Sequence, residues 1–312
     1  MRLKTLQTVS VVVAVVGIIV TAGVYVANRG RQTLATDSSW VYDLGYQEDE
    51  VHPLTFSWPG DRSVPQVPVT LGDKTVDLFF DTGCGVGIFL TNTLENQVRY
   101  TLLGTSEALN RDGSHRGWNK LIRLAEIEVF GATHNGVQTI MSDWRMYSSE
   151  KFNGAIGLAY FQDRVVTLDY VGRRIAIGSN PIDYAQLDQD KYIVLPLRRS
   201  TDPMQVHLPF FEAEYNSEPV IVYLDTGKNH SYIWNPESRG SIGAKPEKYS
   251  DVPIKIGSLE LELKDMVEVG SIAQAEGLPF PTVIEMNSDQ IWKNRLLVTL
   301  DLIDHKIIFR QL

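Results

Sequence analysis

From about Val51 onward, short apolar runs alternate with Gly, Pro, Asn and Asp. The runs are rich in β-branched and aromatic residues, which is typical of strands rather than helices. Helical patterns are few and short. The sequence therefore predicts an all-β fold, with strands at 67–72, 76–80, 127–131, 165–171, 174–178, 192–197, 220–224, 252–257, 259–263, 296–302 and 306–309.

The first 50 residues have a different pattern. Residues 9–27 form a run of 19 residues without a charge, which is long enough to cross a bilayer as a helix. We expect residues 1–30 to be an uncleaved membrane anchor, with a removed signal segment as the alternative. Residues 31–50 are polar and acidic and predict a tether. The rest of the chain is then expected on the extracytoplasmic side, bound to the membrane, or secreted if the segment is cleaved.

The chain also contains an internal duplication. The triplet Asp-Thr-Gly occurs at 81–83 and again at 225–227, each time after an apolar run, at an offset of 225 − 81 = 144. Downstream, Asp169 aligns with Asp301 at an offset of 301 − 169 = 132. Turn residues at 72–73 and 216–217 make each copy a hairpin that leads into its triplet. The duplication predicts two related lobes about a pseudo-twofold axis, which we place at residues 51–185 and 186–312.

Composition limits the partners. The net charge of −9 and the lack of a long basic run argue against nucleic acid. The single cysteine, Cys84, excludes an intrachain disulfide framework and a cysteine-based zinc site. The six histidines are scattered without metal-ligand spacing. We therefore expect no metal and no cofactor.

An aspartate at the end of a buried strand is hydrogen-bonded, exposed in a turn, or used for chemistry. The two triplets, with the segment FNGAIGLAYFQDRVVTLDY at 152–170, resemble the pepsin and retropepsin group of aspartic proteases. The resemblance covers residues 51–312. Short loops and a lack of disulfide-forming cysteines make the chain more similar to two retropepsin halves fused in one chain than to a secreted pepsin.

The resemblance implies two β-barrel lobes that bring Asp81 and Asp225 together as the catalytic residues of an endopeptidase. When two carboxylates lie this close together, they share one proton, because ionising both of them is unfavourable. The ionised one would take a proton from water, and the protonated one would donate to the peptide carbonyl oxygen. An extended peptide or protein segment would lie between the lobes of a monomer. The supporting residues of the family's motif correspond here to Thr82, Gly83, Thr226 and Gly227.

A hairpin that covers the cleft is expected in the first lobe. Turn residues lie between 112 and 117, and residues 121–129 predict a returning strand. Ser114, His115 and Trp118 are then candidate substrate contacts. The alternative is an exposed polar turn with Trp118 packed in the core.

The sequence departs from the family pattern after each triplet. Ser, Thr or Ala is usual there, but this chain has Cys84 and Lys228. A lysine ammonium beside the pair would favour ionised carboxylates and oppose a shared proton, whereas a lysine in solvent would change little. Cys84 has no evident base partner that would make it a nucleophile.

The second lobe departs from the pattern as well. Aligning Asp301 with Asp169 puts residues 286–289 where the glycine element 154–157 stands, so that element is missing from the second lobe. Asp169 and Asp301 themselves are expected to hold turns. These departures leave open a catalytically inactive, protease-like module that binds peptides. A glycosidase-like carboxylate pair would not explain the matched threonines and glycines.

Overall fold

The computed structural model describes residues 37–58, 61–109, 115–143, 152–228, 230–240, 249–272 and 274–312. Residues 38–312 belong to one compact unit. The described part contains no helix long and apolar enough to span a membrane. The apolar run at 9–27, and with it the expected anchor, lies outside the described residues.

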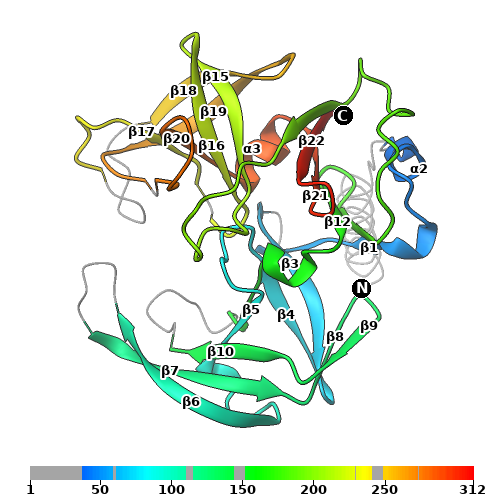
Figure 1. Cartoon of the computed structure of the whole chain (residues 1–312), viewed down its shortest axis with the longest axis vertical. Helices are drawn as coiled ribbons and strands as arrows, with labels where there is room; N and C mark the ends of the chain where they lie inside the picture. The colour runs from blue at the N-terminus through cyan, green and yellow to red at the C-terminus, as the bar shows by residue number, and fades with distance from the viewer. Residues whose placement is uncertain are drawn as a thin grey trace, which may run out of the picture. The chain divides into compact units, whose positions relative to one another are not determined.

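Strands dominate the described residues, which confirms the expected β-rich fold (Figure 1). The first half of the chain forms a ten-stranded sheet, in the lower part of the view. Its strands are β2 (Thr55–Trp58), β3 (Asp61–Leu71), β4 (Lys74–Phe80), β5 (Ile88–Thr91), β6 (Tyr100–Leu109), β7 (His115–Leu124), β8 (Glu126–Val129), β9 (Ala132–Asn135), β10 (Gln138–Ser142) and β11 (Gly154–Ile156).

The second half forms a closed barrel, and a third sheet takes strands from both halves. The barrel strands are β15 (Phe210–Tyr215), β16 (Glu218–Asp225), β17 (Tyr232–Trp234), β18 (Tyr249–Ile256), β19 (Leu259–Val269) and β20 (Thr282–Asn287). The third sheet contains β1 (Val51–Pro53), β12 (Val165–Asp169), β13 (Arg174–Gly178), β14 (Ile193–Pro196), β21 (Leu296–Asp301) and β22 (Lys306–Gln311). The helical segments are short: α2 (Ser39–Asp43), α3 (Ser288–Lys293), and the 3₁₀ turns η1 (Glu48–Glu50), η2 (Asn92–Leu94) and η3 (Leu158–Phe161).

The two predicted hairpins are present. Leu71 pairs with Lys74 across the turn between β3 and β4, and Tyr215 pairs with Glu218 across the turn between β15 and β16. The backbone is left-handed at Gly72 in the first turn (φ +67°) and at both residues of the second turn, Asn216 and Ser217. Such turns match the twist of the strands that they connect.

Strand pairing repeats between the two halves. In the first half, β11 runs parallel to β4 and antiparallel to β5, and β5 runs parallel to β10. In the second half, β20 runs parallel to β16 and antiparallel to β17, and β17 runs parallel to β19. The sequence duplication is therefore matched by a duplication of topology around each triplet.

Of the two expected barrels, the closed barrel of the second half is shown. There, β15 pairs with both β16 and β18, which closes the barrel. In the first half, the edge of β3 is taken by β8, whose other edge pairs with β9. β8 follows β7 after one residue, so the chain returns to β3 there, with Thr70 opposite Glu128. The matching contact in the second half is Glu214 opposite Lys255, since 214 − 70 = 144.

The third sheet joins the two halves through β12 and β21. Their antiparallel pairing is symmetric about Thr167 and Thr299, whose hydroxyls lie 2.7 Å apart. These two residues are separated by the same 132 positions that relate Asp169 to Asp301. Residues aligned by the duplication therefore face each other in space.

Residues 38–50 do not form the tether that we expected for residues 31–50. Trp40, Val41, Leu44 and Tyr46 are buried and pack on the third sheet. The indole nitrogen of Trp40 donates a hydrogen bond to Asp169 at 3.2 Å. Four apolar side chains among polar neighbours were enough to fix this segment to the fold.

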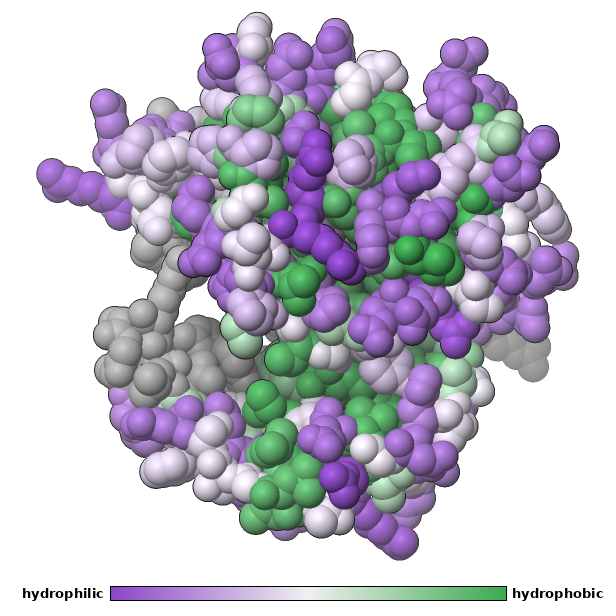
Figure 2. Space-filling view, viewed as in Figure 1, coloured by the Kyte–Doolittle hydropathy of each residue, from purple (hydrophilic) through white to green (hydrophobic). Residues whose placement is uncertain are grey.

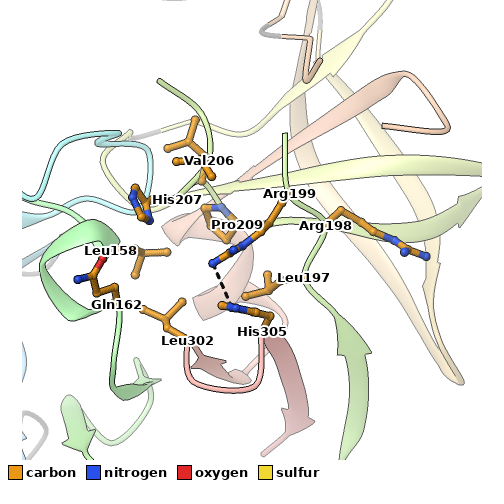
Figure 3. Close-up of a pocket in the computed structure, with 11 residues that line it drawn as sticks. Leu158, Gln162, Leu197, Arg198, Arg199, Val206, His207, Pro209, Leu302 and His305 are labelled. Carbon is orange, nitrogen blue, oxygen red and sulfur yellow. Dashed lines mark hydrogen bonds between the residues drawn. The ribbon is translucent and has the colours of Figure 1, made fainter. Parts of the chain in front are cut away.

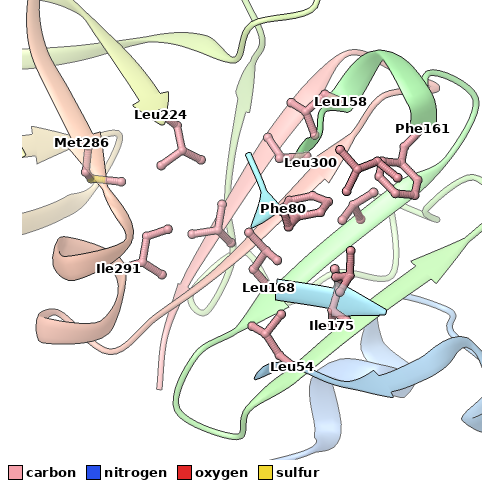
Figure 4. Close-up of a cluster of buried hydrophobic side chains, with 14 of the residues drawn as sticks. Leu54, Phe80, Leu158, Phe161, Leu168, Ile175, Leu224, Met286, Ile291 and Leu300 are labelled. Atoms are coloured by element: carbon pink, nitrogen blue, oxygen red, sulfur yellow. The ribbon is translucent and has the colours of Figure 1, made fainter. Parts of the chain in front are cut away.

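One hydrophobic core runs through both halves. Phe80 and Leu168 of the first half lie in the same buried cluster as Leu224 and Met286 of the second (Figure 4). Phe80 directly precedes the first triplet, and Leu224 directly precedes the second. The core therefore holds the ends of β4 and β16 in one place.

Candidate active site

Each triplet loop is anchored by a strand of its own half. The backbone amide of Asp81 donates to the carbonyl of Ile156 on β11 at 3.0 Å. Asp225, at the end of β16, pairs with Asn287 of β20. The short apolar runs before the triplets thus place both aspartates at equivalent ends of buried strands.

The two loops are tied together by their threonines, an arrangement that we call the threonine cross-link. The amide of Thr82 donates to Oγ1 of Thr226 at 3.1 Å, and the amide of Thr226 donates to Oγ1 of Thr82 at 3.0 Å. Each hydroxyl then donates to a carbonyl across the interface, Thr82 to Leu224 and Thr226 to Phe80, both at 2.7 Å. Both threonines are fully buried.

The glycines of the triplets leave room for the carboxylates. The amide of Gly83 donates to Oδ1 of Asp81 at 2.8 Å, and that of Gly227 donates to Oδ1 of Asp225 at 2.9 Å. A Cβ on Gly83 would lie 2.6 Å from Cγ of Asp225, and a Cβ on Gly227 would collide with the carboxylate of Asp81. Each aspartate therefore packs on the glycine of the opposite loop, so the two carboxylates meet between the loops.

Burial and the charge of Asp225 raise the pKa of Asp81 to about 8, despite the hydrogen bond from Gly83. Asp225 itself is 4% exposed. A buried carboxyl next to a second carboxyl keeps its proton because a second negative charge there is unfavourable. We refer to Asp81 and Asp225 as the carboxylate pair.

Lys228 points at the carboxylate pair rather than into solvent. Its Nζ lies 2.9 Å from Oδ2 of Asp225 and also contacts Oε1 of Glu285, whose side chain is 1% exposed. Burial alone would lower the pKa of Lys228, but the carboxylates of Asp225 and Glu285 outweigh burial and raise it. Lys228 is therefore a cation at neutral pH. Sequence reasoning missed Glu285; the one signal was an acidic residue inside the apolar run of β20.

Cys84 takes the position after the first triplet, and its backbone amide donates to the carbonyl of Asp81 at 3.0 Å. Its thiol donates to the carbonyl of Val86 at 3.2 Å. Burial, and secondarily the charge of Asp81, raises the pKa of Cys84 to about 12. The thiol therefore stays protonated at neutral pH, which does not favour a role as nucleophile.

The glycine element of the first half corresponds to the end of β20, in a register that differs from our alignment. Ile156 pairs with Phe80, and Met286 pairs with Leu224. Met286 therefore matches Ile156 and not Gly154, so the alignment was wrong by two residues. Asn287 takes the place of Gly157, where in the first half a Cβ would lie 2.6 Å from the carbonyl oxygen of Val86.

The loop of the second half has room for the larger residue. The backbone amide of Asn287 donates to the hydroxyl of Ser231 at 2.9 Å, and its side chain donates to the carbonyl of His230. Ser288, which follows, bonds the carbonyl of Thr226 at 3.0 Å. The missing glycine element is thus replaced by polar side chains that support the second triplet.

Asp169 and Asp301 hold turns, as expected. Asp169 accepts the amide of Gly172 at 2.6 Å and the guanidinium of Arg174. Asp301 accepts the amides of Ile303 and Asp304 at 3.0 and 2.9 Å.

The expected covering hairpin corresponds to β6 and β7. The two strands pair from Tyr100 opposite Leu124 to Leu109 opposite His115. The returning strand begins at His115, earlier than we predicted, and residues 126–129 form the separate strand β8. Ser114 lies outside the described residues. Nδ1 of His115 lies 2.7 Å from Oε1 of Glu107, and the His115 ring meets Trp118 edge to face.

Trp118 is exposed and not in the core, which removes the alternative that we gave for it. The side chain is 63% exposed, and other apolar residues of the same hairpin are exposed as well, namely Leu102, Leu103 and Leu121. Figure 2 shows apolar residues gathered over the lower sheet, where Figure 1 places β6 and β7.

A separate small cavity lies beside the connection from β14 to β15. Its volume is about 30 Å³, room for roughly one water molecule. Arg199 reaches toward Nδ1 of His305 at 3.5 Å, and His207 lines the same space (Figure 3). Neither member of the carboxylate pair lines this cavity. Among the described residues, no group of three His, Cys, Asp or Glu side chains is placed to hold a metal ion.

In comparisons with protein-family models and with curated proteins, no match to this chain was found.

Proposed function

We propose that this protein is an aspartic endopeptidase that hydrolyses peptide bonds with a water molecule activated between Asp81 and Asp225. The observation that carries the proposal is the carboxylate pair itself, held by two loops that are hydrogen-bonded to each other through matched threonines. The raised pKa of Asp81 supports it, since one carboxyl of such a pair must keep its proton near neutral pH.

The chemistry follows from one proton shared by two carboxyls. The ionised carboxylate removes a proton from water, and the water oxygen attacks the peptide carbonyl carbon. The protonated carboxyl donates to the carbonyl oxygen at the same time. No covalent enzyme intermediate forms, because water itself is the nucleophile. The glycine amides that donate to both aspartates hold the carboxylates in position for this step.

The fold supports the same proposal. The strands around each triplet repeat in both halves, and the pairing of β12 with β21 is symmetric about Thr167 and Thr299. We infer two lobes related by a pseudo-twofold axis, as in the pepsin and retropepsin group that the triplets resemble. The substrate would be an extended peptide segment between the lobes, with β6 and β7 as the covering hairpin. The membrane anchor at residues 9–27 and the extracytoplasmic location remain part of the proposal.

The test is cleavage of a diverse peptide library by the full-length protein, from acidic to neutral pH. Asp81→Asn and Asp225→Asn should each abolish cleavage, because each removes one carboxyl of the pair. Asp77→Asn is the matched control: this aspartate is exposed on β4, four residues before Asp81. Cleavage that survives in either active-site variant would contradict the proposal.

The contact of Lys228 with Asp225 favours a second candidate, a protease-like module that binds peptides without cutting them. In that case the wild type would bind extended peptides but leave them intact. A gain of cleavage in Lys228→Ser would identify the lysine as the disabling residue.

A further inference from the structure

Three charged groups lie in a row at the second triplet. Nζ of Lys228 contacts Oδ2 of Asp225 at 2.9 Å on one side and Oε1 of Glu285 on the other. Glu285 is buried on β20, and Lys228 is one-third exposed. The amide of Gly227 donates to Oδ1 of Asp225. Both oxygens of this carboxylate therefore accept hydrogen bonds that favour its ionised form.

At the first triplet, the position that matches Lys228 is Cys84, which is not a cation. Asp81 receives the amide of Gly83, and the thiol at the position equivalent to Lys228 donates to a backbone carbonyl instead. Among the described residues, Tyr223 and Cys84 also interact with the pair, and both are neutral at physiological pH because burial raises their pKa values. The Tyr232 ring also faces Lys228, with its centroid 5.9 Å from Nζ.

We propose that Lys228, held in place by Glu285, keeps the negative charge of the carboxylate pair on Asp225 and the proton on Asp81. With Lys228 and Glu285 both charged, their charges cancel. The pair then carries a single negative charge, and that charge is most stable on the carboxyl that the ammonium touches. Lys228 and Glu285 are positioning residues in this scheme, since they act through Asp225.

The inference rests on the proposed function where it assigns catalytic roles. Asp225 is the general base: it takes a proton from water as the water oxygen bonds to the carbonyl carbon. Asp81 is the general acid: it gives its proton to the carbonyl oxygen, which leaves a neutral tetrahedral diol. When the C–N bond breaks, Asp225 returns its proton to the leaving amine, and one hydroxyl of the diol returns a proton to Asp81. The pair ends as it began, and no proton has to be redistributed between turnovers.

The placement of charge can be measured without any peptide cleavage. Aspartate carboxyls of the full-length protein are labelled with ¹³C, and the two signals of the pair are assigned by their loss in Asp81→Asn and Asp225→Asn. At mildly acidic pH, the wild type should show a protonated Asp81 and an ionised Asp225. This difference should shrink in Lys228→Met and persist in Lys228→Arg, which keeps the cation.

The pH profile of cleavage gives an independent readout. Lys228→Met removes a positive charge and should move the profile to higher pH by about 1–3 units. Glu285→Gln removes a negative charge and should move it to lower pH. The double variant should move it less than Lys228→Met alone, because it removes both charges together. The control is Glu268→Gln, a buried glutamate of the same barrel that hydrogen-bonds Asn235 and Ser250.

A purely structural role for Lys228 and Glu285 would lower stability or turnover but would not move the two profiles in opposite directions. The inference is overturned if the proton lies on Asp225 in the wild type, or if Lys228→Met leaves the two carboxyl signals unchanged. If no peptide is cut but the signals behave as expected, the endopeptidase proposal fails while the charge placement stands.

Discussion

The threonine cross-link gives the sharpest test of how the two triplet loops are held together. Thr226→Val keeps the shape of the side chain but removes its hydroxyl. The change leaves two buried backbone groups without their partners, the amide of Thr82 and the carbonyl of Phe80. An unsatisfied buried polar group costs about 1–3 kcal/mol, so the free energy of unfolding should fall by about 2–6 kcal/mol. That is a large part of the stability of an ordinary domain, about 5–15 kcal/mol.

The assay is equilibrium unfolding in urea, in which a lower midpoint at an unchanged slope reports a loss of stability. Thr82→Val removes the mirror-image bonds, to the amide of Thr226 and the carbonyl of Leu224, and should cost a similar amount. Thr226→Ser retains the hydroxyl and loses one methyl group, so it should cost about 1 kcal/mol. Thr70→Val is the surface control, since the hydroxyl of Thr70 bonds only the exposed pair partner Thr75 at 3.0 Å. Its expected cost is within about 0.5 kcal/mol.

Two results would refute this reasoning. The first is a loss in Thr226→Val no larger than that in Thr70→Val, which would mean that the freed backbone groups find other partners at no cost. The second is an equal loss in Thr226→Ser and Thr226→Val, which would assign the effect to packing rather than to the hydroxyl.

Three further predictions follow from the structure. Gly227→Ala should abolish cleavage and destabilise the fold by about 1–3 kcal/mol, because its Cβ would collide with the Asp81 carboxylate; peptide cleavage and urea unfolding measure this. The raised pKa of Asp81 means that the folded state keeps a proton that the unfolded chain has released, so this carboxyl costs stability as pH rises from about 4 to 8, by at most about 1.4 kcal/mol per pH unit. Asp81→Asn should remove that slope in unfolding measured across this range. Trp40→Ala should cost about 3–5 kcal/mol, because the indole is fully buried and bonded to Asp169; thermal unfolding measures it.

Each of these predictions has a control on the same element or in a comparable setting. Gly104→Ala adds a Cβ where no atom lies within 4 Å, so it should change the free energy of unfolding by no more than about 0.5 kcal/mol. Asp77→Asn changes an exposed carboxyl of β4 and should keep the slope of stability with pH. Tyr42→Ala removes a side chain of α2 that is 68% exposed. If a control changed the measured quantity as much as its test variant, the physical reason given for that test variant would be wrong.

The duplication could be predicted from sequence because residues in equivalent places have equivalent neighbours. Thr82 and Thr226 make the same bonds in both directions, so both positions need a buried hydroxyl on a tight loop. Thr167 and Thr299 pair across β12 and β21 for the same reason. The offsets of 144 and 132 in the sequence therefore reappear as pairs of residues in contact.

The features that sequence did not predict depend on pairing between distant segments. Lys228 and Glu285 are 57 positions apart, and their contact requires β20 to lie beside the second triplet. Trp40 reaches Asp169 across 129 positions, so the composition of its own segment could only indicate a tether. The edges of β3 and β15 are taken by β8 and β18, and the residue pattern of a strand does not identify the strand that will pair with it.

The site combines a symmetric frame with an asymmetric charge, and the two have different physical requirements. The frame must hold the two triplet loops at a fixed distance from each other. The equivalent hydrogen bonds of Thr82 and Thr226 do this from both loops. The charge must be unequal, because a carboxylate pair with one proton is already asymmetric at every instant. A cation that contacts Asp225 and not Asp81 does not oppose a carboxylate pair with one proton. It favours the form in which Asp225 is ionised and Asp81 is protonated. The position after the triplet can therefore differ between the halves, Cys84 in one and Lys228 in the other, while the threonines and glycines before it cannot.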